Sequence, residues 1–221
     1  MSCFRIARIL VFIAAGAWIA FGQEKEAKPE NKGLPPRVSA TDYQAQGKAG
    51  DITIGAEFDR HAVPVEEGSP LSAEEYVVVE VAVFGPPGTK LTLSQDQFSL
   101  RINGKKQAAP SEPFEVVFKS LKDPEWIPPD TGDKKSKTSI GGGGGGGAAG
   151  DNSPPPVPHM PLELRRAMES KVRRAAMPEG DRALPQAGLL FFSYRGKEKG
   201  ISSVELIYQG PAGKATLKLT P

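Results

Sequence analysis

Apolar residues recur at every second position in several short segments of the chain, which is the pattern of half-buried β-strands. The segments with this alternation are 52–59, 76–84, 98–103, 114–119, 190–194, 204–208 and 214–219. Segment 76–84 is apolar on both faces except at Glu80, which predicts a central strand. The turn sequences Asn103-Gly104 and Gly210-Pro211-Ala212-Gly213 follow two of these segments. The pattern therefore predicts seven strands joined in part by tight turns.

One helix is predicted over residues 161–176, with Pro161 in its first turn and Pro178 beyond its end. The apolar positions that recur at helical spacing are Leu164, Met168, Val172 and Ala175. The other faces are basic, and their arginines are Arg165, Arg166, Arg173 and Arg174. Two interpretations stay open. In the first, the helix packs its apolar stripe against the strands and its charged side chains face water. In the second, its arginines contact a membrane surface or an acidic partner.

Two stretches have the composition of flexible linkers, because they offer few apolar side chains for burial. Residues 23–46 are mostly Lys, Glu, Pro, Gly and Asn, and are expected to be a disordered spacer. Residues 122–160 contain the glycine run Gly141 to Gly147 and a triple proline, and are expected to be a disordered linker.

From the number of predicted strands, the expected fold is an all-β, immunoglobulin-like antiparallel β-sandwich of about seven strands over 47–221, with a Gly/Pro-rich insertion and one amphipathic helix.

The first 22 residues have the pattern of an export signal peptide. Arg5 and Arg8 precede an apolar run over 9–21, and small residues stand three and one places before Gln23. The apolar run over 9–21 is shorter than the apolar segment that a membrane-spanning helix needs. We expect cleavage before Gln23 and a mature protein that is periplasmic or extracellular.

The amino-acid composition limits the classes of ligand and partner that the mature chain can bind. The only cysteine, Cys3, lies in the predicted signal, so the mature chain has neither a disulfide nor a thiolate metal ligand. Loss of Arg5 and Arg8 lowers Lys+Arg from 28 to 26 against 26 Asp+Glu, which leaves the mature chain neutral. A neutral chain argues against nucleic acid as a partner, because phosphate binding needs a basic excess on one face.

Two parts of the chain together resemble a known family. The valine-rich segment 76–84 is followed by a strand with the pattern Phe-x-Leu at Phe98 and Leu100 that ends at Gly104. Later come a Gly188-x-x-x-Phe192 strand and a closing hairpin. This series is similar to the telokin-like immunoglobulin domains of exported bacterial proteins. The resemblance implies an extracytoplasmic binding or assembly module, and the long insertion before Gly188 departs from the family pattern.

Patterns of catalytic and metal-binding residues are sparse. Neither His61 nor His159 has a second histidine at ligand spacing. The run Gly141 to Gly147 lacks the Lys-Ser/Thr ending of a phosphate-binding loop. The acidic pairs 66–67 and 74–75 lack the spacing of a calcium loop. We therefore expect no catalytic residue, no metal ligand and no cofactor.

Trp126 and Ile127 are the candidate partner-binding residues outside the helix, since they follow the fourth predicted strand among prolines. An aromatic side chain in that setting can anchor a partner. Alternatively, the two residues pack over the open end of the sandwich. Both interpretations stay open at this stage.

The sequence favours a non-enzymatic protein-interaction or assembly module of the bacterial cell envelope, with another envelope protein as its partner. An exposed strand edge or a loop is the expected contact. One alternative is a membrane-anchored structural protein that keeps its N-terminal segment and rests its basic helix on anionic lipid. A hydrolase of unrecognised type is a further alternative, because fold and function often separate.

Overall fold

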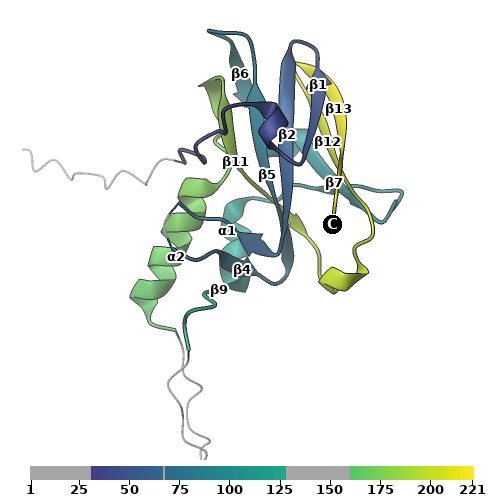
Figure 1. Cartoon of the computed structure of the whole chain (residues 1–221). Helices are drawn as coiled ribbons and strands as arrows, with labels where there is room; N and C mark the ends of the chain where they lie inside the picture. The colour runs from purple at the N-terminus through teal and green to yellow at the C-terminus, as the bar shows by residue number, and fades with distance from the viewer. Residues whose placement is uncertain (1–30, 67, 128–159) are drawn as a thin grey trace, which may run out of the picture.

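Two four-stranded antiparallel sheets pack face to face in the computed structural model, which describes residues 31–66, 68–127 and 160–221 (Figure 1). The first sheet has the order β1 (Ala45–Ala49), β2 (Ile52–Arg60), β5 (Tyr76–Phe84) and β11 (Gln186–Ser193). The second has the order β13 (Gly213–Leu219), β12 (Val204–Gly210), β7 (Phe98–Ile102) and β8 (Ala109–Pro110). The expected all-β sandwich is confirmed, and β5 lies inside its sheet as predicted.

The core between the sheets follows directly from the two-residue alternation. Ile54, Val79 and Phe192 of the first sheet are fully buried against the second. Leu206 and Tyr208 face them from β12, and the Tyr208 ring lies 5.1 Å from that of Phe98. Alternate positions of β13 are exposed, because that face of the second sheet is open to solvent.

The outer face of the first sheet carries a third layer, made chiefly by helix α2 (Leu162–Ala175) (Figure 1). Met168 and Val172 of α2 pack in one apolar cluster with Val78 and Phe191 of the sheet. A small sheet joins this layer, with strands β3 (Ala62–Val63), β4 (Leu71–Ala73) and β9 (Leu121–Lys122). The helix is therefore confirmed, and its apolar stripe packs on the sandwich.

Short elements complete the described chain. Strands β6 (Lys90–Leu93) and β10 (Gly180–Ala183) form a separate two-stranded ribbon. The remaining elements are α1 (Phe114–Val117) and the single-turn helices η1 (Ala40–Asp42), η2 (Gln95–Gln97), η3 (Phe118–Ser120) and η4 (Glu198–Gly200).

The strand predicted over 114–119 is wrong, because this segment is helical in α1 and η3. A strand would place Phe114, Val116 and Phe118 on one face. The structure instead buries Val117, leaves Val116 exposed, and brings the rings of Phe114 and Phe118 to 5.8 Å across one helical turn. Helical spacing lets Val117, Phe114 and Phe118 all contact the apolar cluster under α2.

The disorder predicted over 23–46 is also wrong for residues 31–46. The Leu34 amide donates to the Ala187 carbonyl at 2.9 Å, Tyr43 is buried, and β1 starts at Ala45. The outer face of the first sheet supplies the apolar surface that this segment lacks by itself. Lys122 of the predicted linker lies in β9, whereas residues 1–30 and 128–159 lie outside the described part of the chain.

Seven described strands have five or more residues, but they are not the seven that the alternation predicts. Strand β1 replaces the segment at 114–119. Numbered in chain order, the first, second, third and fifth of these strands (β1, β2, β5 and β11) form the first sheet. The fourth, sixth and seventh (β7, β12 and β13) belong to the second sheet. An immunoglobulin constant domain instead places its third strand in the second sheet.

Candidate functional site

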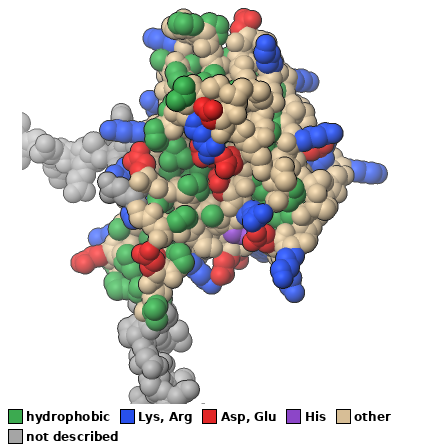
Figure 2. Space-filling view, viewed as in Figure 1, with side chains coloured by type: hydrophobic (Ala, Val, Ile, Leu, Met, Phe, Trp, Pro, Cys, Tyr) green, Lys and Arg blue, Asp and Glu red, His purple; other side chains and the backbone are tan. Residues whose placement is uncertain are grey.

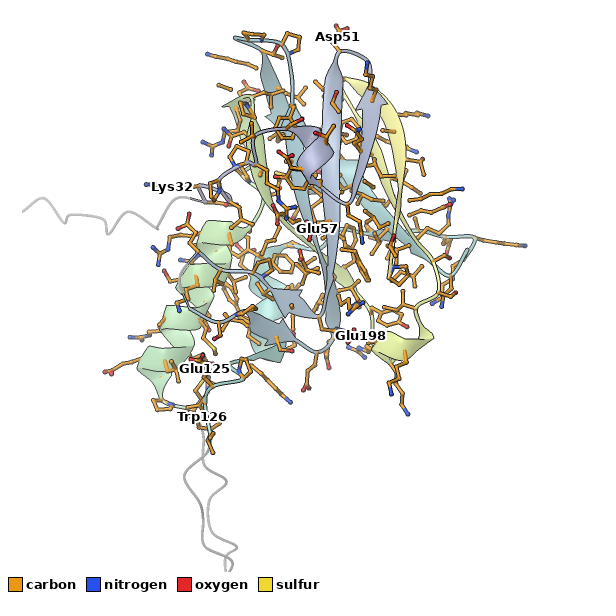
Figure 3. All side chains as sticks on the ribbon, in the orientation of Figure 1. Lys32, Asp51, Glu57, Glu125, Trp126 and Glu198 are labelled. Carbon is orange, nitrogen blue, oxygen red and sulfur yellow. The ribbon has the colours of Figure 1, made fainter. Side chains whose placement is uncertain are left out.

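Trp126 lies just beyond β9, at the end of the molecule where α2 begins, and Ile127 follows it in the chain (Figures 1 and 3). A turn positions them, in which the Trp126 amide donates to the Asp123 carbonyl at 3.1 Å. The Trp126 side chain is half-buried, whereas Ile127 is 83% exposed. Leu162, the first residue of α2, is 55% exposed. This end of the molecule therefore presents large apolar side chains to solvent.

The four candidate arginines all lie on α2, where Arg165, Arg166 and Arg174 are exposed and Arg173 is half-buried. None of them takes part in an ion pair within the described part of the chain. Helical geometry spreads them around the outward faces, because the apolar stripe fixes the helix rotation. Arg165, Arg166 and Arg174 thus place their charges at the surface of the described part of the molecule.

A surface hollow of about 420 Å³ separates the first half of α2 from η3 and β9. Four apolar side chains line it: Phe118, Leu121, Met160 and Met168. The charged side chains that line it are Lys119, Arg165 and Glu169. Of the residues proposed from sequence, only Arg165 belongs to this lining. Phe118 and Lys119, which also line the hollow, belong to segment 114–119, for which the sequence predicted a strand and not a helix.

A second cluster, which sequence reasoning missed, lies on the outer face of the first sheet around Arg37. Its guanidinium forms ion pairs with Glu57 and, at 3.3 Å, with Glu80, and lies 4.5 Å from the centre of the Tyr43 ring. Figure 2 shows a basic group between acidic groups in the middle of this face, and Figure 3 labels Glu57 there. Although burial alone lowers the pKa of Arg37, the two carboxylates raise it above its ordinary value.

Asp59 lies beside this cluster at an irregularity of β2, where the pairing with β5 shifts between Phe58 and Arg60. Its Oδ2 atom is buried and has no hydrogen-bond partner among the described residues. Burial, followed by the nearby charges of Glu80 and Glu57, raises the pKa of Asp59 to about 7. This carboxyl group therefore titrates close to neutral pH.

Asp59, His61 and Ser72 line a further hollow of about 380 Å³. The His61 Nδ1 atom lies 2.7 Å from the Tyr76 carbonyl oxygen and therefore carries a proton that it donates there. No hydrogen bond links the three side chains to one another in the described ranges. The arrangement lacks the nucleophile–base contact of covalent catalysis. His159 lies outside the described residues.

The described ranges hold no group of three or more His, Cys, Asp or Glu side chains placed to bind a metal ion. No helix there has the length and apolar character needed to cross a membrane.

The fold and these surfaces define the chain as an all-β sandwich whose first sheet is covered by a helix and an N-terminal segment. Comparison of the chain with protein-family models, with curated proteins and with solved structures found no match.

Proposed function

We propose that this protein is an exported, non-enzymatic protein-interaction or assembly module of the bacterial cell envelope. The observation that carries the proposal is the exposed end of the third layer. There Leu162 begins α2, whose Arg165 and Met168 line a hollow with an apolar floor, and the exposed Ile127 follows Trp126, which lies at the same end of the molecule (Figure 3). Exposed apolar groups rimmed by polar side chains are typical of partner-binding surfaces. The signal-like pattern of residues 1–22 supports export, and the telokin-like resemblance supports an envelope role.

Strand addition at an open sheet edge is the weaker route for such a contact. Three backbone amides, of Leu34, Glu112 and Met177, already donate to carbonyls along the outer edge of β11, at 2.8 to 3.0 Å. The other edge of that sheet, β1, lies beside β13, and the Gln44 amide group donates to the Thr220 carbonyl at 2.9 Å (Figure 1). The α2 end is therefore the better-supported partner surface.

Site-specific photo-crosslinking in the native envelope tests this function. A photoreactive amino acid replaces Ile127 in one variant and Val38, which is 98% exposed on the N-terminal segment, in a matched control. We expect an adduct with an envelope protein at position 127 and none at position 38. Equal labelling at both positions, or no adduct at 127, would contradict the proposal.

A membrane-anchored structural protein is the second candidate, favoured by the apolar run over 9–21 and the exposed arginines of α2. The mass of the protein purified from the envelope separates the two candidates. A chain that begins at Gln23 contradicts the anchored version, whereas a chain that retains Arg5 and Arg8 supports it.

A further inference from the structure

The hollow between α2 and η3 has a floor and walls of different chemistry. Its apolar side chains include Met168, which is buried, and Phe118 and Met160, which are half-buried. A volume of about 420 Å³ is enough for one large apolar side chain of a partner. Because the apolar surface is concave, it suits an inserted side chain better than a flat layer.

The charges of the walls are asymmetric. Lys119 of η3 and Arg165 of α2 are exposed cations on the two sides of the hollow, and neither forms an ion pair within the described residues. Glu169 lies one helical turn further along α2. The first turn of α2, near Arg165, also carries the positive end of the helix dipole. Negative charge is thus favoured between Lys119 and Arg165, beside the first turn of α2, and opposed beside Glu169.

We infer that this hollow binds a protein segment with one large apolar anchor residue flanked on one side by carboxylates. The anchor occupies the apolar floor, and the carboxylates pair with Lys119 and Arg165. The inference rests on the proposed function and names the chemistry of the partner at that surface. Charge complementarity selects this occupant, because two exposed cations, with no ion pair to any described residue, border a floor made of apolar side chains.

The test uses a fluorescently labelled peptide with a central phenylalanine and glutamates on one side only. The protein is the chain as purified after export. Fluorescence anisotropy measures the affinity, and two control peptides carry glutamine for glutamate or alanine for phenylalanine. We expect both controls to bind about tenfold more weakly than the first peptide.

Neighbouring arginines supply a matched pair of protein variants. Arg165→Glu reverses a charge in the hollow, whereas Arg166→Glu reverses one on the adjacent exposed residue outside it. We expect a loss of affinity of about tenfold for the first and less than about twofold for the second. Lys119→Glu on the opposite wall should repeat the loss, which keeps the test valid if one variant is unstable.

Several outcomes would overturn the inference. Equal effects of the two arginine variants would show a diffuse charge effect. Tighter binding of the chain to phosphatidylglycerol vesicles than to the peptide would indicate a lipid surface. Peptide binding that appears only after removal of residues 128–159 would indicate that the chain fills its own hollow. If the peptide fails while position 127 still crosslinks an envelope protein, the partner chemistry is wrong and the proposed function stands.

Discussion

Replacement of Asp59 by asparagine should change how stability depends on pH. The pKa of Asp59 is about 7 in the folded protein, against an ordinary value of 3.8. A raised folded-state pKa means that the folded protein holds this proton more tightly than the unfolded chain. The stability contributed by the protonated group is therefore fully present below about pH 4, and it is lost as the pH rises through 7.

The size of the effect follows from proton linkage. One unit of pKa shift corresponds to about 1.4 kcal/mol, so the two values predict a loss of about 2.5 kcal/mol in unfolding free energy between pH 5 and pH 8. The asparagine side chain of the variant does not ionise and loses none of this. The stability of Asp59→Asn relative to wild type should therefore rise by about 2.5 kcal/mol over the same range.

Urea unfolding at a series of pH values measures this difference. Titration of the other carboxylates is shared by both proteins and largely cancels in the comparison. Asp51→Asn, which changes an exposed carboxylate in the turn between β1 and β2, is the matched control (Figure 3). A difference between Asp59→Asn and wild type that stays constant from pH 5 to pH 8 would refute the reasoning.

Three further predictions concern the packing of the first sheet. Arg37→Met should lower the unfolding free energy by about 1 to 3 kcal/mol, because the nearly buried Glu80 loses its cation. The double variant Arg37→Met/Glu80→Gln should regain part of this loss, as measured by urea unfolding. No recovery would contradict the pairing of Arg37 with Glu80. Val172→Ala should cost about 2 kcal/mol in thermal unfolding, because this side chain of α2 is fully buried against the first sheet, and a cost near zero would contradict that packing. Gly188→Ala should lower the unfolding free energy by about 1 to 3 kcal/mol and lower the melting temperature, because its Cβ would lie 2.4 Å from the Met177 Cα atom. The control Gly200→Ala, whose Cβ would meet nothing nearer than 3.7 Å, should leave the melting temperature almost unchanged.

The candidate site was only partly predictable. The exposed arginines of α2 and the pair Trp126 and Ile127 carry local signals, namely helical spacing and an aromatic residue among prolines. The hollow beside Arg165 has no such signal, because Phe118 lies in a segment that alternates like a strand. The Arg37 cluster had one usable signal, which is the charged Glu80 within an otherwise apolar strand. A carboxylate in that position requires a cation nearby.

The sequence by itself determined the long strands and helix α2. In 204–208 and 161–176 the side-chain period alone assigns residues to the core or to solvent, and in 76–84 apolar residues on both faces mark a strand that is buried on both sides. That period is a local property, and the turns beside these segments fix where they end.

Only the tertiary structure decided the state of 31–46 and of 114–120. Residues 31–46 contain too few apolar side chains to order themselves, and become ordered on the apolar outer face that β5 and β11 supply. Residues 114–120 fit either period, and the cluster under α2 selects the helix because it buries Val117. In both segments the free energy of burial comes from surface contributed by distant parts of the chain, which no local pattern encodes.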